Sequence, residues 1–357
     1  MATSPTRRLV HDADGLNTGT WPVPADQFIT PAPDLFSRSH AAVPTIDPIR
    51  WRLAIDGLVR RPMAFSLGDL ERFPRREVTA TLICAGLRRD EFLSLGPLSG
   101  ELPWGPEPAG TGRWRGFGLR ELLAAADPDP RARYVEFVGL DRVERQGRQF
   151  GFGASVDLSK ALGWEVLLAT ELNGHPLTPA HGSPVRAIVP GWIGARSVKW
   201  LGRITLLAEP SSNYFQTQAY RVQREQNPDD PRDVSRGAAL TSVSVNSVIL
   251  EPTRDEILSA GPAAVRGWAI GCEGKRLRRV EVSADGGGEW VPAQLGHHEP
   301  WSWTLWESVV VLQRGSRELV VRATDEDGNS QPATLAETWN VKGYANNAWH
   351  RVPVEVS

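Results

Sequence analysis

Residues 81–91 read Thr81-Leu82-Ile83-Cys84-Ala85-Gly86-Leu87-Arg88-Arg89-Asp90-Glu91. An apolar run that includes β-branched residues ends at Cys84, and a small Ala-Gly turn and two arginines follow directly. A thiolate is a soft anionic ligand that suits a transition metal, and nearby guanidinium groups favour the thiolate and hold anions through paired hydrogen bonds. The stretch therefore indicates a strand end that places a metal ligand beside an anion site. The alternative is that Cys84 is a small buried hydrophobic residue, as a single cysteine after a strand commonly is.

The composition is that of a globular protein of two or three domains. The chain has 357 residues, of which 41% are hydrophobic and 23% charged, and its net charge is −2. A charge near zero predicts no general binding to nucleic acid or to an anionic membrane, and no apolar run approaches membrane-spanning length. The 14 tryptophans, 28 prolines and 34 glycines indicate a strand-rich, loop-rich fold.

The cysteines also limit the possible sites. Cys84 and Cys272 are far apart and show neither metal-finger nor disulfide spacing, which fits a reducing compartment. We interpret Cys272 as a packed strand residue. Arg7-Arg8 is followed by the polar run 11–15 instead of the apolar segment of an export signal, so we expect no signal peptide and a cytoplasmic location.

The order of elements predicts an α+β fold. Alternating residues predict a strand over 51–59, and we predict further strands over 77–83 and 133–141. Leucines at helical spacing predict a helix over 118–126. Ser66, followed three residues later by Asp69, predicts a capped helix start. From residue 241, short strands alternate with turn signals such as Asp285-Gly286, which is typical of an immunoglobulin-like β-sandwich. We place the domains at residues 1–240 and 241–357, with 221–236 as the connection.

A second dense stretch occupies residues 181–200, His181-Gly182-Ser183-Pro184-Val185-Arg186-Ala187-Ile188-Val189-Pro190-Gly191-Trp192-Ile193-Gly194-Ala195-Arg196-Ser197-Val198-Lys199-Trp200. Its glycines let backbone N–H groups approach a ligand, and Arg186, Arg196, Lys199 and Ser197 supply cations and a hydroxyl. Together these groups could cradle a phosphate. A strand–turn–strand with solvated charges is the alternative.

Both stretches resemble signatures of the sulfite oxidase family of molybdopterin oxidoreductases. Cys-Ala-Gly-x-Arg-Arg resembles the family's molybdenum-cysteine segment, and residues 181–200 resemble its His-Gly-x-Pro-x-Arg…Gly-Ala-Arg-Ser-Val-Lys-Trp signature, in the family's order. The resemblance extends from about Asp34 to Val356. It implies a mixed α/β molybdopterin-binding domain followed by an immunoglobulin-like domain through which the protein forms a homodimer.

The resemblance also implies which residues form the site. Molybdenum would be held by Cys84, two pterin sulfurs and oxo groups. The Phe-x-Arg-x-His segment and a strand-terminal aspartate complete a cofactor-binding set of Phe36, Arg38, His40, Cys84, Asp141, His181, Arg186, Ser197, Val198 and Lys199. Arg38, Arg89 and Lys342 would form an oxyanion pocket lined by Trp104. On position alone, Asp141 could instead cap a turn, and Trp104 could be a half-buried surface anchor.

The reaction implied is two-electron oxygen-atom transfer from the molybdenum cofactor to sulfite, giving sulfate. Because the chain contains no haem-binding segment, we expect no haem and a separate electron acceptor such as a cytochrome. Three positions depart from the family. The active-site tyrosine aligns with Val234, unless Tyr214 or Tyr220 folds back; Lys342 replaces an arginine; and Leu87 replaces an asparagine. A molybdenum reductase of nitrate, sulfoxide or another oxyanion, and a non-catalytic protein with a vestigial cofactor pocket, therefore stay as alternatives.

Overall fold

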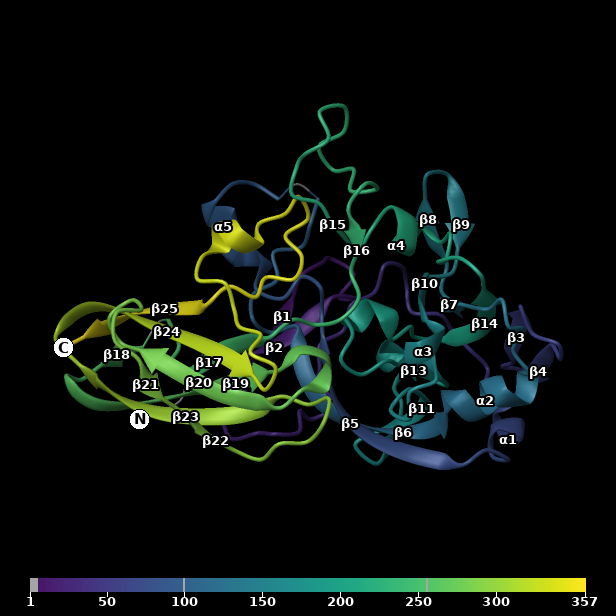
Figure 1. Ribbon diagram of the computed structural model, residues 1–357, viewed down its shortest axis with the longest axis horizontal. Helices are drawn as coiled ribbons and strands as arrows, with labels where there is room; N and C mark the ends of the chain where they lie inside the picture. The colour runs from purple at the N-terminus through teal and green to yellow at the C-terminus, as the bar shows by residue number, and fades with distance from the viewer. Residues whose placement is uncertain (1–5, 99, 255) are drawn as a thin grey trace.

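The computed structural model describes residues 6–98, 100–254 and 256–357. Figure 1 shows a lobe of mixed helices and strands beside a second lobe made almost entirely of strands. The predicted α+β fold is thereby confirmed.

One five-stranded sheet of the first lobe has the order β10-β7-β14-β3-β4. Strand β14 pairs parallel with β3 and antiparallel with β7, so the sheet is mixed. The strands are β3 (Leu53–Gly57), β4 (Met63–Phe65), β7 (Tyr134–Gly139), β10 (Gly153–Asp157) and β14 (Leu201–Leu207).

The second sheet of this lobe delivers Cys84 to the site. Its order is β12-β11-β6-β5, and β13 pairs with β11. Strand β5 pairs with β6 from Arg75↔Phe117 to Ile83↔Ala109, so the ladder ends one residue before the cysteine. The strands are β5 (Arg75–Ile83), β6 (Ala109–Gly118), β11 (Leu167–Leu172), β12 (His175–Pro176) and β13 (Arg186–Ile188).

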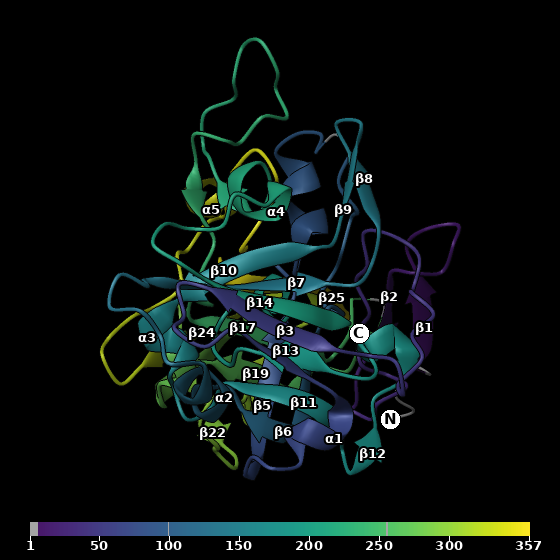
Figure 2. The same ribbon diagram turned by 90° about the vertical axis from the view of Figure 1, so that its right-hand side faces the viewer.

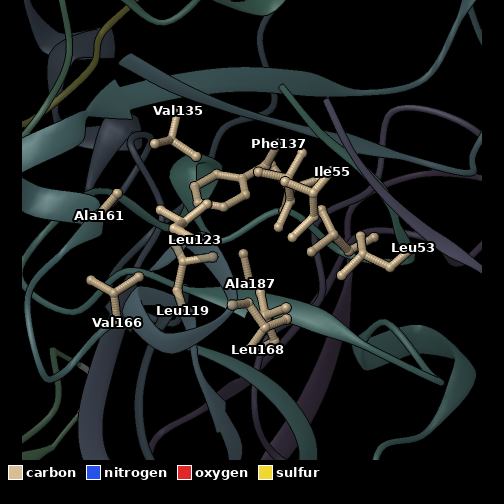
Figure 3. Packing of buried hydrophobic residues seen from close by; sticks show 14 of the residues in the cluster. Leu53, Ile55, Leu119, Leu123, Val135, Phe137, Ala161, Val166, Leu168 and Ala187 are labelled. Atoms are coloured by element: carbon tan, nitrogen blue, oxygen red, sulfur yellow. The ribbon is translucent and has the colours of Figure 1, made fainter. Parts of the chain in front are cut away.

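A single apolar core joins the two sheets. Figure 3 shows Phe137 and Ile55, from the first sheet, packed with Leu119 of helix α2 (Leu119–Ala126) and Leu168 of the second sheet. The predicted helix over 118–126 is confirmed. The predicted capped start also forms, because Ser66 and Asp69 make a capping box at α1 (Leu67–Leu70). The remaining described helices are α3 (Leu158–Ala161), α4 (Tyr214–Thr217) and α5 (Leu335–Thr338).

The second lobe is the expected β-sandwich. A four-stranded sheet, β17-β19-β23-β22, faces a five-stranded sheet, β18-β25-β24-β20-β21, around a separate apolar cluster. The strands are β17 (Asn246–Glu251), β18 (Ile257–Leu258), β19 (Gly261–Ile270), β20 (Leu277–Ser283), β21 (Val291–Pro292), β22 (Gln294–Leu295), β23 (Thr304–Leu312), β24 (Gly315–Asp325) and β25 (His350–Val356). Asp285-Gly286 does not form a two-residue hairpin turn. It lies in a longer loop in which the Asp285 carboxylate accepts backbone N–H groups of the residues that follow it.

Three short hairpins complete the described chain: β1 (Arg7–Val10) with β2 (Thr18–Trp21), β8 (Val143–Arg145) with β9 (Arg148–Phe150), and β15 (Arg221–Val222) with β16 (Ala238–Ala239). The polar segment between β15 and β16 projects as an extended loop in both ribbon views, and Figure 1 shows it above the junction of the lobes (Figures 1 and 2). None of the described helices is long and apolar enough to cross a membrane.

Arg88 fixes the segment after Cys84 between the lobes. Its fully buried guanidinium pairs with Glu91 and donates to Asn246 Oδ1 at 3.1 Å and to the Ala348 carbonyl at 2.9 Å. A buried charge is tolerated only when it is paired and hydrogen-bonded. These contacts therefore fix the position of the second lobe relative to the turn after Cys84. The first of the two arginines is therefore structural.

Candidate functional site

A pocket opens where β5 ends, and we call it the inner pocket. Its wall comes from the segment before β3, the end of β5 and the turn after it, residues 180–200, and single residues near 141, 152 and 220. The residues that line it include Phe36, Ser37, Arg38, Ser39, His40, Cys84, Asp141, Phe152, His181, Arg186, Ser197, Val198, Lys199, Trp200 and Tyr220. All ten residues of the predicted cofactor-binding set lie in this wall, although they come from four separate parts of the chain.

Cys84 is buried in this wall, and its Sγ accepts the Gly86 N–H at 3.4 Å. Burial raises the pKa of the thiol above its usual value, and this effect outweighs the opposite effects of Gly86, Arg89 and Arg38. The arginines act in the expected direction, but without a metal they do not make the group a thiolate. A bound metal cation would supply the missing stabilisation, because a coordinating thiol loses its proton.

Two cations face the pocket, the buried Arg186 and the half-buried Lys199, and neither makes an ion pair with a carboxylate among the described residues. Arg186 donates to the His181 carbonyl at 3.0 Å and to the Ser197 carbonyl at 2.9 Å, and its buried Nε has no partner in the described structure. Burial lowers the pKa of Arg186 to about 9. Lys199 Nζ donates to Ser39 Oγ at 2.7 Å, and burial, followed by Arg186, lowers the pKa of Lys199. Desolvated cations of this kind are stabilised by an anionic ligand.

The remaining residues of the 181–200 stretch shape the cradle. His181 Nε2 lies 3.0 Å from the Ala32 carbonyl, and burial lowers the pKa of His181 to about 4, so the ring is neutral near pH 7. Ser197 Oγ accepts the Val189 N–H at 3.0 Å. At Gly182, where φ is +101°, a Cβ atom would lie 2.9 Å from Lys199 Cβ, so the close approach at this turn requires glycine.

The Phe-x-Arg-x-His segment contributes a polar edge. Arg38 donates to Asn17 Oδ1 at 2.9 Å, which orients its guanidinium, and the His40 ring stacks on Phe152. His40 Nε2 lies 2.8 Å from the Tyr220 hydroxyl. Burial, followed by Arg38, lowers the pKa of His40, and burial raises the pKa of Tyr220 to about 12, so both groups are neutral near pH 7.

Asp141 caps a turn, as its position suggested, and it also lies in the wall of the inner pocket. Its Oδ1 accepts the Phe152 N–H at 2.9 Å, which fixes the turn before β10, and the side chain also lines the inner pocket. Burial raises the pKa of this carboxyl, and Lys199 acts in the opposite direction. A carboxylate here can accept hydrogen bonds from the N–H groups of a bound ring.

A second hollow, which we call the outer pocket, adjoins the inner one through the shared residues Arg38 and His40. Its wall also contains Lys342 and Tyr344 from the second lobe, Arg145 from the β8–β9 hairpin, and Glu101. The Arg89 guanidinium lies over the Tyr344 ring at 5.0 Å. The structure therefore brings the three predicted oxyanion ligands Arg38, Arg89 and Lys342 to one region, although Arg89 and Lys342 come from different lobes.

Three residues highlighted by the sequence lie elsewhere. Trp104 is fully buried beneath the site, with its ring 4.2 Å from that of His11, and lines neither described pocket. Arg196 donates to the Leu240 and Phe215 carbonyls, so it braces the interdomain segment. Val234 is fully buried and also lines neither pocket. The phenol at the site belongs instead to Tyr220, because the chain after α4 does fold back.

Sequence reasoning missed two site residues, Glu101 and Tyr344. Glu101 directly precedes the Leu-Pro-Trp segment, but nothing in the local pattern directs its carboxylate toward cations. Tyr344 stands two residues after Lys342, and its ring stacks on Tyr220 with 5.5 Å between centroids. Only the folding of the second lobe against the first makes that contact.

The fold and the site together define a molybdopterin-binding protein with an appended β-sandwich. Residues 40–215 match the family model of the oxidoreductase molybdopterin binding domain, and residues 238–357 match the Mo-co oxidoreductase dimerisation domain. The chain is 39% identical to human mitochondrial sulfite oxidase over 93% of its length, and it spans 62% of that protein. It is 37% identical to the chicken sulfite oxidase, of which it spans 73%. The chain therefore belongs to the sulfite oxidase family.

Other relatives carry out different reactions. Nitrate reductase [NADH] 2 of Phaseolus vulgaris is 35% identical over 99% of the chain, which spans 41% of that protein. The crystal structure of the sulfane dehydrogenase SoxCD from Paracoccus pantotrophus has a TM-score of 0.79 and 27% identity, and it covers 96% of this chain and 86% of its own. The family is established, but these relatives differ in substrate.

The inner pocket fits a pterin-bound molybdenum. The described residues contain no group of three or more His, Cys, Asp or Glu side chains able to hold a metal alone, so a metal here needs ligands from a cofactor. Cys84 offers one thiol, the unpaired Nε of Arg186 and the Lys199 ammonium offer partners for a phosphate, and Asp141 offers an acceptor for ring N–H groups.

Proposed function

We propose that the chain is a molybdenum oxidoreductase that oxidises sulfite to sulfate and passes the electrons to a separate acceptor. One observation carries the proposal. The buried thiol of Cys84 shares a pocket with Arg186 and Lys199, and this pocket adjoins an outer pocket that contains Arg38 and Lys342, with Arg89 close by. This combination offers one site for the cofactor and a neighbouring site for a small oxyanion.

Different residues would hold the different parts of the cofactor. Arg186, Lys199 and Asp141 would hold the pterin and its phosphate, and Cys84 would ligate the molybdenum. When bound, the cofactor supplies two-electron oxygen-atom transfer, while the protein supplies orientation and electrostatics.

The chain's own groups then act on the substrate. Arg38, Arg89 and Lys342 attract and orient the oxyanion. Because burial raises the pKa of Tyr220 to about 12, the phenol keeps its proton and can donate a hydrogen bond, while neutral His40 fixes its direction from 2.8 Å.

The test is sulfite-dependent reduction of ferricyanide by molybdenum-loaded protein, with Cys84→Ser as the control. Activity that disappears in the variant supports the proposal. No turnover of sulfite despite stoichiometric molybdenum would refute it.

A nitrate reductase is the second candidate, favoured by the 35% identity to the bean nitrate reductase and by Lys342, a point charge without the bidentate fork of arginine. Turnover of nitrate with reduced viologen, in protein that does not oxidise sulfite, would select this candidate.

We further propose that the chain forms a homodimer through its second lobe, as the match to the dimerisation domain suggests. Paired positions on β19 and β23 place Pro262 beside Val311 and Ala264 beside Val309 on the outer face of the four-stranded sheet. Val309 and Val311 are exposed. An apolar face of this kind is a natural surface for a second copy.

A further inference from the structure

The outer pocket contains an ionic contact that the proposed reaction does not use. Glu101 Oε1 lies 3.0 Å from Lys342 Nζ, and Glu101 Oε2 lies 3.5 Å from Arg89 Nη1. One carboxylate from the first lobe thus bridges two cations that come from different lobes. Both cations belong to the set that would bind the oxyanion.

This bridge is largely shielded from water. The side chains of Glu101 and Lys342 are each 15% exposed, and that of Arg89 is 5% exposed. Ion pairs at this depth are screened less by water and salt than surface pairs, so the contact affects any other anion that approaches.

The other carboxylates of the outer pocket do not act in this way. Asp233 accepts Asn227 Nδ2 and the Ser235 N–H, and Asp230 accepts the Arg232 N–H. Neither makes an ion pair within the described ranges 6–98, 100–254 and 256–357. Among the carboxylates that line the outer pocket, Glu101 is therefore the one that pairs with Lys342 and with the neighbouring Arg89.

We propose that Glu101 is an internal competitor of the substrate and sets the oxyanion affinity of the outer pocket. Its carboxylate has the negative charge and the bridging contacts that a bound oxyanion would have. An oxyanion reaches Arg89 and Lys342 only by displacing this carboxylate from at least one of them. The inference rests on the proposed function, since it takes the outer pocket as the oxyanion site.

Glu101 could instead help the substrate to bind, and that role predicts the opposite change in anion affinity when its charge is removed. If the carboxylate instead positioned Arg89 and Lys342 for the substrate, removing its charge would weaken anion binding. If it competes, removing the charge strengthens binding, because both cations become available and one repulsive charge is lost. The direction of the change therefore separates the two roles.

The experiment compares the binding of inorganic sulfate to wild-type holoenzyme and to Glu101→Gln by isothermal titration calorimetry. We expect sulfate to bind about tenfold more tightly to the variant, as loss of one nearby like charge predicts. Glu144→Gln is the matched control, because Glu144 is exposed beside Arg145 but does not line the pocket. We expect the sulfate affinity of this variant to stay within about twofold of wild type. Equal molybdenum content and thermal midpoint in all three proteins establish that the fold is intact.

Unchanged or weaker sulfate binding in Glu101→Gln would overturn the proposal, as would an equal gain in Glu144→Gln. If Glu101→Gln does not fold, Glu101→Asp replaces it, and a carboxylate one methylene shorter should give an intermediate gain. Tighter sulfate binding in an enzyme that does not oxidise sulfite would refute the proposed reaction and leave this inference standing. If the enzyme oxidises sulfite but Glu101→Gln leaves the sulfate affinity unchanged, the proposed reaction stands and this inference is refuted.

Discussion

Arg186→Gln tests whether a buried cation is kept for the cofactor or for the fold. Burial lowers the pKa of Arg186 from 12.5 to about 9. At 1.36 kcal/mol per pKa unit, the buried charge costs the cofactor-free protein about 5 kcal/mol. Its two hydrogen bonds to the His181 and Ser197 carbonyls return about 1.5–3 kcal/mol each. Because these contributions nearly cancel, we expect the substitution to change the free energy of unfolding of the cofactor-free protein by less than about 2 kcal/mol.

Arg196→Gln is the matched control. Arg196 is buried as deeply, and burial lowers its pKa to about 10, which corresponds to a cost of about 3 kcal/mol. However, all three of its guanidinium nitrogens donate to the Leu240 and Phe215 carbonyls, which returns about 5–9 kcal/mol. We therefore expect Arg196→Gln to destabilise the cofactor-free protein by about 2–6 kcal/mol.

The assay has two parts. Both variants are produced in a host that cannot make the pterin. Their free energies of unfolding are measured by urea unfolding, with tryptophan fluorescence as the signal. Molybdenum and pterin contents are then measured in protein from a competent host, where Arg186→Gln should retain cofactor about a hundredfold more weakly because it lacks a charge-assisted contact. Full cofactor content in Arg186→Gln, or destabilisation equal to that of Arg196→Gln, would refute the reasoning.

Three further predictions concern the ligand, the pH dependence and the assembly. Cys84→Ser should lose molybdenum-dependent turnover while near-ultraviolet circular dichroism stays unchanged, because serine is nearly isosteric in the wall of the inner pocket; full activity would exclude Cys84 as the ligand. Burial lowers the pKa of His350 to about 3. Below about pH 6.5 this histidine is therefore protonated in the unfolded chain but neutral in the folded chain, so the free energy of unfolding falls as the pH falls from 6.5 toward 3. At pH 5.5 this amounts to about 1.4 kcal/mol, which His350→Gln should remove from the difference in unfolding free energy between pH 7.5 and 5.5; an unchanged difference would contradict the assignment. Val311→Asp, at a position 71% exposed, should convert the proposed dimer to a monomer in light scattering, and a dimer mass would exclude this face.

Local sequence determined the elements that carry the site. The apolar, β-branched run before Cys84 was sufficient to predict a strand that ends one residue before the thiol, because such a run is typical of a buried strand. The leucine spacing of α2 and the Ser66–Asp69 capping box are likewise local, and both form as expected. The residues predicted to bind the cofactor also lie together. They were predicted from the family resemblance, and members of a family share the tertiary fold that brings such residues into one site.

Only the tertiary structure decided which polar groups meet. Arg88 and Arg89 are adjacent in the sequence, yet Arg88 clamps the two lobes while Arg89 faces Glu101, because the left-handed conformation at Arg88 (φ +55°) turns the chain between them. Sequence alone left open whether Tyr214 or Tyr220 reaches the site in place of Val234. Tyr220 lines the inner pocket because it packs against His40 and Tyr344, which are distant in the sequence. Burial also reversed the pKa expected for Cys84, since desolvation depends on everything around a group and no single stretch of sequence specifies it.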